Sequence, residues 1–395
     1  NYIVENGKNI VIYDYKSKKN DFSKAKKATL NLQDDYAINV YDYKKLKNNT
    51  NRIIPVIGFN PDDGLKVGIS DLYTKYGFER NPFSSQHQLK GAYYFATNGF
   101  ELAYRFEAAN VIENINFEFV ASLQSPNFTQ NFFGYGNETL NENDDDNFNF
   151  NRIKVRKFTI NPSLKWRSRS GSKAYFQLNY ESIEVNNTSG RFVENNIELP
   201  TYIFNEVEFI GAEAKYEFEN TDSKAYPTNG ITTAMTLGYK SNLNVKNRDY
   251  SYFIPEVGFT QKIDPAGNLV LATLFKSQIN FGDNFEFYQG ASIGGIDGLR
   301  GFRNQRFLGN QSFYNNTDLR YSFSSHKTSV IPIRFGVYGS FDYGRVWLKG
   351  EESNKWNNSY GGGFFLNGAE LVTANLGVFN SLDGIRVAFK LGFGF

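Results

Sequence analysis

The chain alternates between apolar and polar residues from Ile53 onward, in segments of about ten residues that are separated by turn residues. The segment 99–108 is an example, with Phe100, Leu102, Tyr104 and Phe106 on one face and Glu101, Arg105 and Glu107 on the other. Period-two alternation predicts β-strands with one apolar face. The pattern is typical of a membrane β-barrel, and taken alone it also fits a soluble sandwich.

The number and spacing of these segments favour the barrel. About sixteen strands are predicted, an even number within the range of single-chain outer-membrane barrels. They cover residues 53–60, 65–75, 87–96, 99–108, 113–122, 152–166, 173–185, 206–219, 230–240, 249–262, 267–281, 311–323, 329–347, 358–366, 371–379 and 384–395. Most inward turns are short, whereas the outward connections 124–151, 186–205 and 282–310 are long. A soluble sandwich gives no reason for short and long connections to alternate in this way. We therefore expect an all-β, antiparallel transmembrane barrel over residues 53–395.

The C-terminal segment carries the strongest local signal. Its apolar residues alternate without a break and end on an aromatic: Ile385, Val387, Phe389, Leu391, Phe393 and Phe395. Such a strand would promote aggregation in water, whereas it is stable when it faces lipid and its neighbours are paired. Phe389, Leu391, Phe393 and Phe395 resemble the sorting signal of bacterial outer-membrane proteins. We therefore expect the bacterial outer membrane as the location and its lipid as a partner.

Composition narrows the classes of function. The chain has no apolar run of eighteen residues, no Cys and a net charge of +2, so a membrane-spanning helix, thiolate metal sites and nucleic-acid binding are not expected. Residues 1–52 contain ten lysines and few large aliphatic residues. They are predicted to form a periplasmic linker or extended arm, and plain disorder fits equally well. Because the chain starts at Asn1, we expect a mature or trimmed fragment whose upstream domain could be missing.

Catalytic and metal-binding patterns are weak. The two histidines, His87 and His326, are far apart in the strand pattern, and no nucleophile elbow, metalloprotease motif or phosphate-binding loop occurs. Asp144–Asp146 with Glu142 offer oxygen ligands for Ca²⁺ without the spacing of a known loop, so a solvated outward loop is the preferred interpretation. We expect no enzyme, no cofactor and no metal site in this chain.

The segment Ile293–Asn310 combines four glycines before Phe302 with an arginine inside the glycine run. A phosphate-binding loop would require a following helix, but residues 311–323 alternate as a strand. Alternation also turns Asp318 and Asp342 toward the lumen on adjacent strands. We expect this loop to fold into the barrel and Arg300 to pair with one or both carboxylates, although ordinary lumenal partners for Asp318 and Asp342 are the alternative.

Three motifs carry a family resemblance: LRGF at Leu299, Arg300, Gly301 and Phe302, FDYG at Phe341–Gly344, and NTDLR at Asn316–Arg320. Together with the turn at 220–230 they resemble the superfamily that contains BamA, TamA and the two-partner secretion transporters. The resemblance covers roughly residues 53–395. It implies a sixteen-stranded barrel whose sixth outward loop lies inside, with Arg300 locked to Asp342 and to Asp318.

The chain departs from this superfamily at its N-terminus, because residues 1–52 are too short and too poor in core residues for one periplasmic module. The patterns at Asn60–Gly64 and Asn131–Thr139 resemble barrels of Bacteroidota proteins in which a metallophosphoesterase or a patatin-like lipase precedes the barrel. No such domain is present in the sequence, and its existence upstream of Asn1 stays open.

The first functional hypothesis is insertion, translocation or surface display of proteins, with a client or fused polypeptide as partner and other outer-membrane complex subunits as further candidate partners. Its mechanism would use a weak seam between a short first strand starting at Ile53 and a last strand loosened by Gly384, Gly392 and Gly394. The alternatives are a plugged membrane anchor or scaffold for a partner complex or a fused hydrolase, and a passive pore.

Overall fold

The computed structural model describes residues 2–32, 34, 48–76, 83–112, 114–142, 149–168, 170–194, 199–224, 226–295, 298–329, 331–369 and 372–393. Regular structure in this part of the chain is almost entirely β, with two short 3-10 helices, η2 (Thr201–Phe204) and η3 (Phe287–Gln289). The barrel strands are β3 (Thr50–Asn60), β4 (Gly64–Lys75), β5 (Ser85–Tyr94), β6 (Gly99–Ile112), β7 (Ile115–Asn131), β8 (Arg152–Arg167), β9 (Ser172–Asn186), β10 (Val207–Thr221), β11 (Gly230–Asn242), β12 (Tyr250–Lys262), β13 (Leu269–Phe281), β16 (Gln311–Ser322), β17 (His326–Lys327), β18 (Pro332–Trp347), β19 (Asn357–Gly368), β20 (Val372–Ser381) and β21 (Gly384–Phe393).

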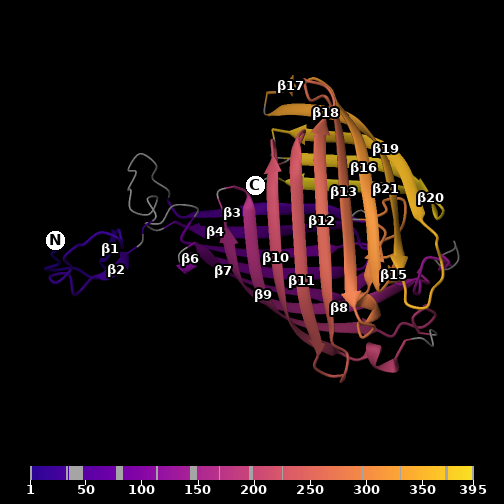
Figure 1. The fold of residues 1–395 in the computed structure, drawn as a ribbon, viewed down its shortest axis with the longest axis horizontal. Coiled ribbons are helices and arrows are strands. Elements are labelled where there is room, and N and C mark those ends of the chain that lie inside the picture. The colour runs from indigo at the N-terminus through magenta and orange to yellow at the C-terminus, as the bar shows by residue number, and fades with distance from the viewer. Residues whose placement is uncertain are drawn as a thin grey trace.

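These strands form one closed antiparallel barrel (Figure 1), with sixteen long strands and the two-residue β17 among the described residues. The expected all-β barrel fold is therefore confirmed, and most predicted strands overlap their counterparts within a few residues. Two boundaries differ more: β7 extends to Asn131, well past the predicted end at 122, and β6 extends to Ile112, past the predicted end at 108. β3 starts at Thr50 and has 11 residues, so the expected short first strand is wrong.

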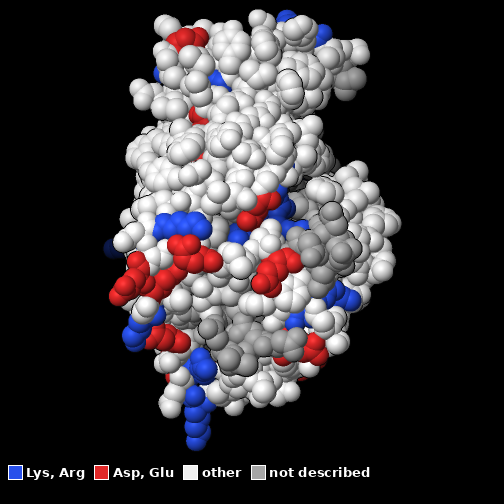
Figure 2. All heavy atoms as spheres, turned by 90° about the vertical axis from the view of Figure 1, so that its right-hand side faces the viewer, with Lys and Arg blue, Asp and Glu red and all other residues white. Residues whose placement is uncertain are grey.

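The outer face of the barrel is apolar. Large hydrophobic side chains are exposed at alternate positions on every side, including Leu89, Phe176, Leu237, Phe364 and Ile385. The face shown in Figure 2 has a broad band almost without charged side chains, and Lys, Arg, Asp and Glu gather below it. An apolar belt between polar ends is what a bilayer requires of a barrel surface.

The lumen side carries the charges, and they are paired. Ion pairs join neighbouring strands along the inner wall: Lys90–Glu101, Arg105–Glu118, Lys157–Glu181 and Lys276–Glu256. A further pair, Lys240–Glu181, reaches across β10 from β11 to β9. Buried charges are costly unless they are paired, so this wall needs the alternating strand pattern to bring opposite charges together. The polar interior also provides the surface on which an inward-folded loop can be held.

The N-terminal segment lies outside the barrel, on its left in Figure 1. It contains a parallel pair of short strands, β1 (Val11–Asp14) and β2 (Thr29–Leu32), around the buried side chains of Ile12 and Ala25. Within the described residues, no helix has the length and apolar character needed to cross a membrane.

The barrel closes where β21 adjoins β3. Among the described residues, every other pair of neighbouring long strands has a residue-by-residue register, whereas none joins β21 to β3. We call this junction the seam. The two strands run in opposite directions, so their outward ends are Asn60 on β3 and Gly384 on β21.

Candidate functional site

The segment Ile293–Asn310 enters the barrel as a hairpin. Its base is the short antiparallel pair β14 (Ala291–Ile293) and β15 (Phe307–Gly309). Gly294 and Gly295 have φ of 124° and 86°, values that other residues rarely adopt, so these glycines allow the chain to turn directly after β14. We call residues 293–310 the lumen loop.

The lumen loop packs against the barrel wall through a small hydrophobic cluster. Leu299 and Phe302 are buried and pack with Ile293 and Phe307 from the loop and with Tyr314 and Val346 from the barrel wall. The rings of Phe302 and Phe307 meet edge to face, with their centroids 5.2 Å apart. This packing fixes the loop tip so that the residue between Leu299 and Gly301 projects toward the wall.

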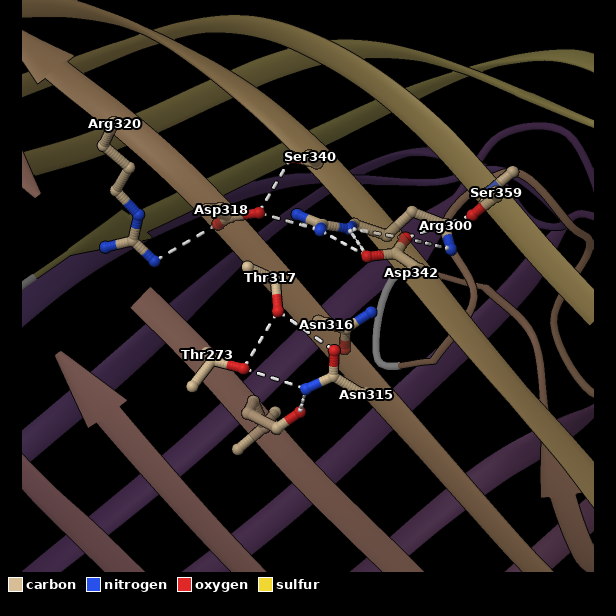
Figure 3. A network of polar contacts seen from close by, with 12 residues as sticks. Thr273, Arg300, Asn315, Asn316, Thr317, Asp318, Arg320, Ser340, Asp342 and Ser359 are labelled. Carbon is tan, nitrogen blue, oxygen red and sulfur yellow. Dashed lines mark hydrogen bonds and ion pairs between the residues drawn. The ribbon is translucent and has the colours of Figure 1, made fainter. Parts of the chain in front are cut away.

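Arg300 projects between two carboxylates of the wall (Figure 3). Its Nη2 lies 2.5 Å from Asp342 Oδ1 on β18 and 2.8 Å from Asp318 Oδ1 on β16. Its Nε also donates to Asp342, and its backbone N–H donates to Asp342 Oδ2 at 3.1 Å. The Asp342 side chain is 0% exposed, so the pair is shielded from water. The geometry uses the planar fork of an arginine, which a lysine lacks.

Neighbouring hydroxyl and amide groups complete the arrangement. Ser359 Oγ donates to Asp342 Oδ2 and accepts from the N–H of Gly301, and Ser381 Oγ donates to the carbonyl of Gly301. Asn316 Nδ2 donates to the carbonyl of Gly298 at 2.7 Å. A Cβ on Gly301 would lie 2.6 Å from Ser359 Cβ, so the loop approaches the wall more closely than any larger residue permits.

The electrostatics of Arg300 favour its charged form. Burial by itself lowers the pKa of a guanidinium, but the hydrogen bond to Asp342 and the charges of Asp318 and Asp342 outweigh burial and raise the pKa of Arg300. For Arg303, three residues further along the chain, the effect of burial prevails and the pKa is lowered. Burial, with the charges of Arg152 and Arg386, lowers its pKa to about 10.

A second loop arginine has partners that the sequence did not suggest. Arg306 Nε donates to Asp383 Oδ2 at 2.7 Å, in the outward turn between β20 and β21. Its Nη1 and Nη2 donate to Oγ1 and the carbonyl of Thr139. The rings of Phe133 and Phe307 lie 4.7 and 4.6 Å from its guanidinium carbon. Only the presence of Arg306 was visible in the sequence, because Asp383 and Thr139 are far away in the chain.

The inward turn 222–229 also enters the lumen. Asp222 accepts hydrogen bonds from the N–H groups of Thr228 and Asn229, which holds the turn in shape. Tyr226 is buried and stacks on Phe365, with ring centroids 4.8 Å apart. A cavity of about 410 Å³ lies between this tyrosine and Arg300.

The remaining predicted residues lie apart from this arrangement. Ile53 and Phe389 lie on the seam strands β3 and β21. Gly384 has a φ of 94° at the β20–β21 turn, and a Cβ there would meet nothing within 4 Å, so it shapes a turn and does not loosen strand packing. Gly392, Leu391 and Phe393 pair with β20 through their backbones, whereas Gly394 and Phe395 lie outside the described residues.

The candidate catalytic and metal residues do not converge. His87 contacts Tyr104 on the barrel wall and His326 contacts the carbonyl of Ser324 at an inward turn. Asp144–Asp146 lie outside the described residues. Within the part of the chain that is described, no group of three His, Asp or Glu side chains could hold a metal ion.

An apolar belt, a lumen of paired charges and an inward-folded loop define the class of protein as a membrane-spanning β-barrel. Residues 206–368 match the model of the family described as haemolysin secretion/activation protein ShlB/FhaC/HecB. This match, which covers less than half of the chain, and the fold of the solved structures agree with the expected outer-membrane localisation. No protein with curated function matches the sequence.

Solved structures show the same fold. BamA from Haemophilus ducreyi lacking POTRA domains 1–3 aligns with a TM-score of 0.63 at 14% identity, over 87% of this chain and 70% of that one. CdiB from Escherichia coli aligns with a TM-score of 0.54 at 11% identity, over 87% and 62%. CdiB from Acinetobacter baumannii aligns with a TM-score of 0.54 at 12% identity, over 88% and 60%. The chain thus spans about three fifths of the CdiB chains.

Proposed function

We propose that this barrel moves or inserts polypeptides at the outer membrane, with the seam between β21 and β3 as the place where a client strand is received. The family model that matches residues 206–368 describes secretion and activation proteins, which supports this class of function. The observation that carries the proposal is the seam itself, because the described residues give it no ladder register while all other long neighbouring strands have one.

A strand edge with few hydrogen bonds to its neighbour is a template for β-augmentation. A client segment in extended form could pair with β21 or β3 along the edges for which the described residues show no register between the two strands. The lumen loop, held by Arg300 to Asp342 and Asp318, would keep the rest of the wall rigid while the seam changes. This division of roles requires no catalytic residue in the chain.

The test is photo-crosslinking at the seam in living outer membranes. A photoreactive residue at Ile385 on β21, or at Ile53 on β3, lies on the lipid side and is 75% or 67% exposed in the parent. We expect adducts with other polypeptides at both positions. The matched control is Phe176 on β9, also exposed but far from the seam in the strand order. Equal adducts at all three positions, or none at the seam, would refute the proposal.

The plugged anchor and the passive pore are distinguished by conductance. Tyr226 and the lumen loop both occupy the lumen, which favours a plugged barrel over an open pore. Steady, large conductance of the purified parent barrel in a planar bilayer would favour the passive pore. A silent barrel without polypeptide adducts would favour the anchor or scaffold for a partner complex or a fused hydrolase.

A further inference from the structure

Three consecutive residues of the lumen loop reach both sides of the seam at its outward end. On the β3 side, Asn304 Nδ2 donates to Asp62 Oδ2 at 2.7 Å, in the turn between β3 and β4. Gln305 Oε1 accepts from the N–H of Asn131 at the outward end of β7. On the β21 side, Arg306 pairs with Asp383. The contacts of Asn304 and Arg306 lie at the outward ends of β3 and β21, the two strands for which the described residues show no register with each other.

The contacts are buried. Asp62 is 3% exposed and Arg306 is 4% exposed, so water competes weakly for either. Asp62 also accepts from Asn131 Nδ2 at 2.9 Å, which fixes the orientation of its carboxylate. Gln305 has a φ of 56°, an unusual value for a residue other than glycine, and this backbone turn points Asn304 and Arg306 to opposite sides.

The loop is attached to both sides. Toward β18–β21 it is held by the ion pairs of Arg300 and Arg306 and by the hydrogen bonds of Gly301 to Ser359 and Ser381. Toward β3–β9 it is held by the side chains of Asn304 and Gln305, by the bonds of Arg306 to Thr139, and by the N–H of Gly136, which donates to the carbonyl of Leu308 at 2.7 Å. Bidentate pairs between charged groups are stronger than bonds with a neutral donor or acceptor.

We propose that Asn304, Gln305 and Arg306 form a clasp that holds the outward end of the seam closed. Opening releases Asn304 from Asp62, Gln305 from Asn131 and Arg306 from Thr139, while the loop stays with the β20–β21 hairpin through Arg306 and Asp383. The clasp is a regulatory part of the seam, so the inference rests on the proposed function. It assigns the loop a task beyond the anchoring of Arg300.

The test measures the width of the seam directly. The chain has no Cys, so Leu65→Cys on β4 and Leu382→Cys in the β20–β21 turn accept spin labels at two unique, exposed positions. Pulsed electron spin resonance in lipid vesicles then reports the distance between them. We expect one narrow distribution in the parent. In Asn304→Ala/Gln305→Ala we expect a second population that is longer by at least one strand spacing, about 5 Å.

Controls separate the clasp from a general loosening. Lys349→Ala removes an outward ion pair with Asp283, is 79% exposed, and should leave the distribution unchanged. Arg306→Ala should broaden the distribution more than Asn304→Ala/Gln305→Ala; where it fails to fold, the double variant decides, because it leaves both arginine anchors intact. Unchanged distances in the double variant overturn the clasp.

The outcomes also separate the clasp from the function it would regulate. Longer distances in the double variant without polypeptide adducts at Ile385 support the clasp and refute the client-receiving seam. Adducts at Ile385 with unchanged distances support the seam and refute the clasp. If both hold, the double variant should increase the adducts at Ile385 at least severalfold over Lys349→Ala.

Discussion

Arg300→Ala is the substitution with the largest expected effect on the lumen loop. It leaves the carboxylate of Asp342, which is 0% exposed, with only the Ser359 hydroxyl and the backbone N–H of residue 300 as donors. Removing one partner of a buried ion pair costs about 3–5 kcal/mol, because the remaining charge stays desolvated. Since about 1.4 kcal/mol is tenfold, the loop should open roughly a hundredfold more often or more.

Hydrogen exchange of loop peptides measures this opening. We expect residues 298–302 to lose protection in Arg300→Ala, and the barrel strands β8–β12 to keep theirs. Arg300→Lys retains the charge without the planar fork and should cost about 1–2 kcal/mol. The free-energy cost of Asp342→Asn should lie between those of Arg300→Lys and Arg300→Ala, because Asp318 still pairs with the guanidinium at 2.8 Å. Unchanged protection of 298–302 in both Arg300→Ala and Asp342→Asn would refute the anchoring role of the pair.

Three further predictions concern single positions. Gly301→Ala places a Cβ 2.6 Å from Ser359 Cβ, so hydrogen exchange at 298–302 should increase while Gly350→Ala, in open space, changes only its own turn. Arg303→Gln removes a buried cation, and burial lowers the pKa of Arg303 to about 10. The melting temperature of the variant should therefore equal or exceed that of the parent below pH 10, and the gain should fade at higher pH, where Arg303 itself loses its charge. A large decrease in melting temperature below pH 10 would contradict this prediction. Tyr226→Ala removes the ring stacked on Phe365, so conductance in planar bilayers should rise, and equal conductance would contradict its plugging role.

The barrel could be predicted from the sequence because its determinants are local. Alternation of apolar and polar residues decides which face of a strand meets lipid, and this pattern is readable over ten residues. The ends of strands were less predictable. β7 continues to Asn131 past the shift in register near Phe128, and β3 begins at Thr50, where the residues preceding Ile53 are polar. Pairing with a neighbour extended both strands beyond their hydrophobic pattern.

The candidate site was predictable only in part. Arg300 stood out in a glycine run, and alternation pointed Asp318 and Asp342 inward, so the three could be considered together. Asp383 and Thr139 carried no such signal. Their link to Arg306 spans 77 and 167 residues of sequence, and it depends on how three outward connections meet above the barrel.

The position of the lumen loop gives its two arginines different mechanical consequences. Arg300 contacts β16 and β18, which have continuous registers with their neighbours, so this anchor lies in a part of the wall that ladder hydrogen bonds already hold. Arg306 contacts a turn that ends at the seam, where the described residues have no ladder. A loop bound only by Arg300 would fill the lumen without affecting closure. Because the same short segment also holds Asp383 and Asp62, the proposed clasp predicts that movement at the loop tip and movement at the seam are coupled, so that a client that displaces one loosens the other.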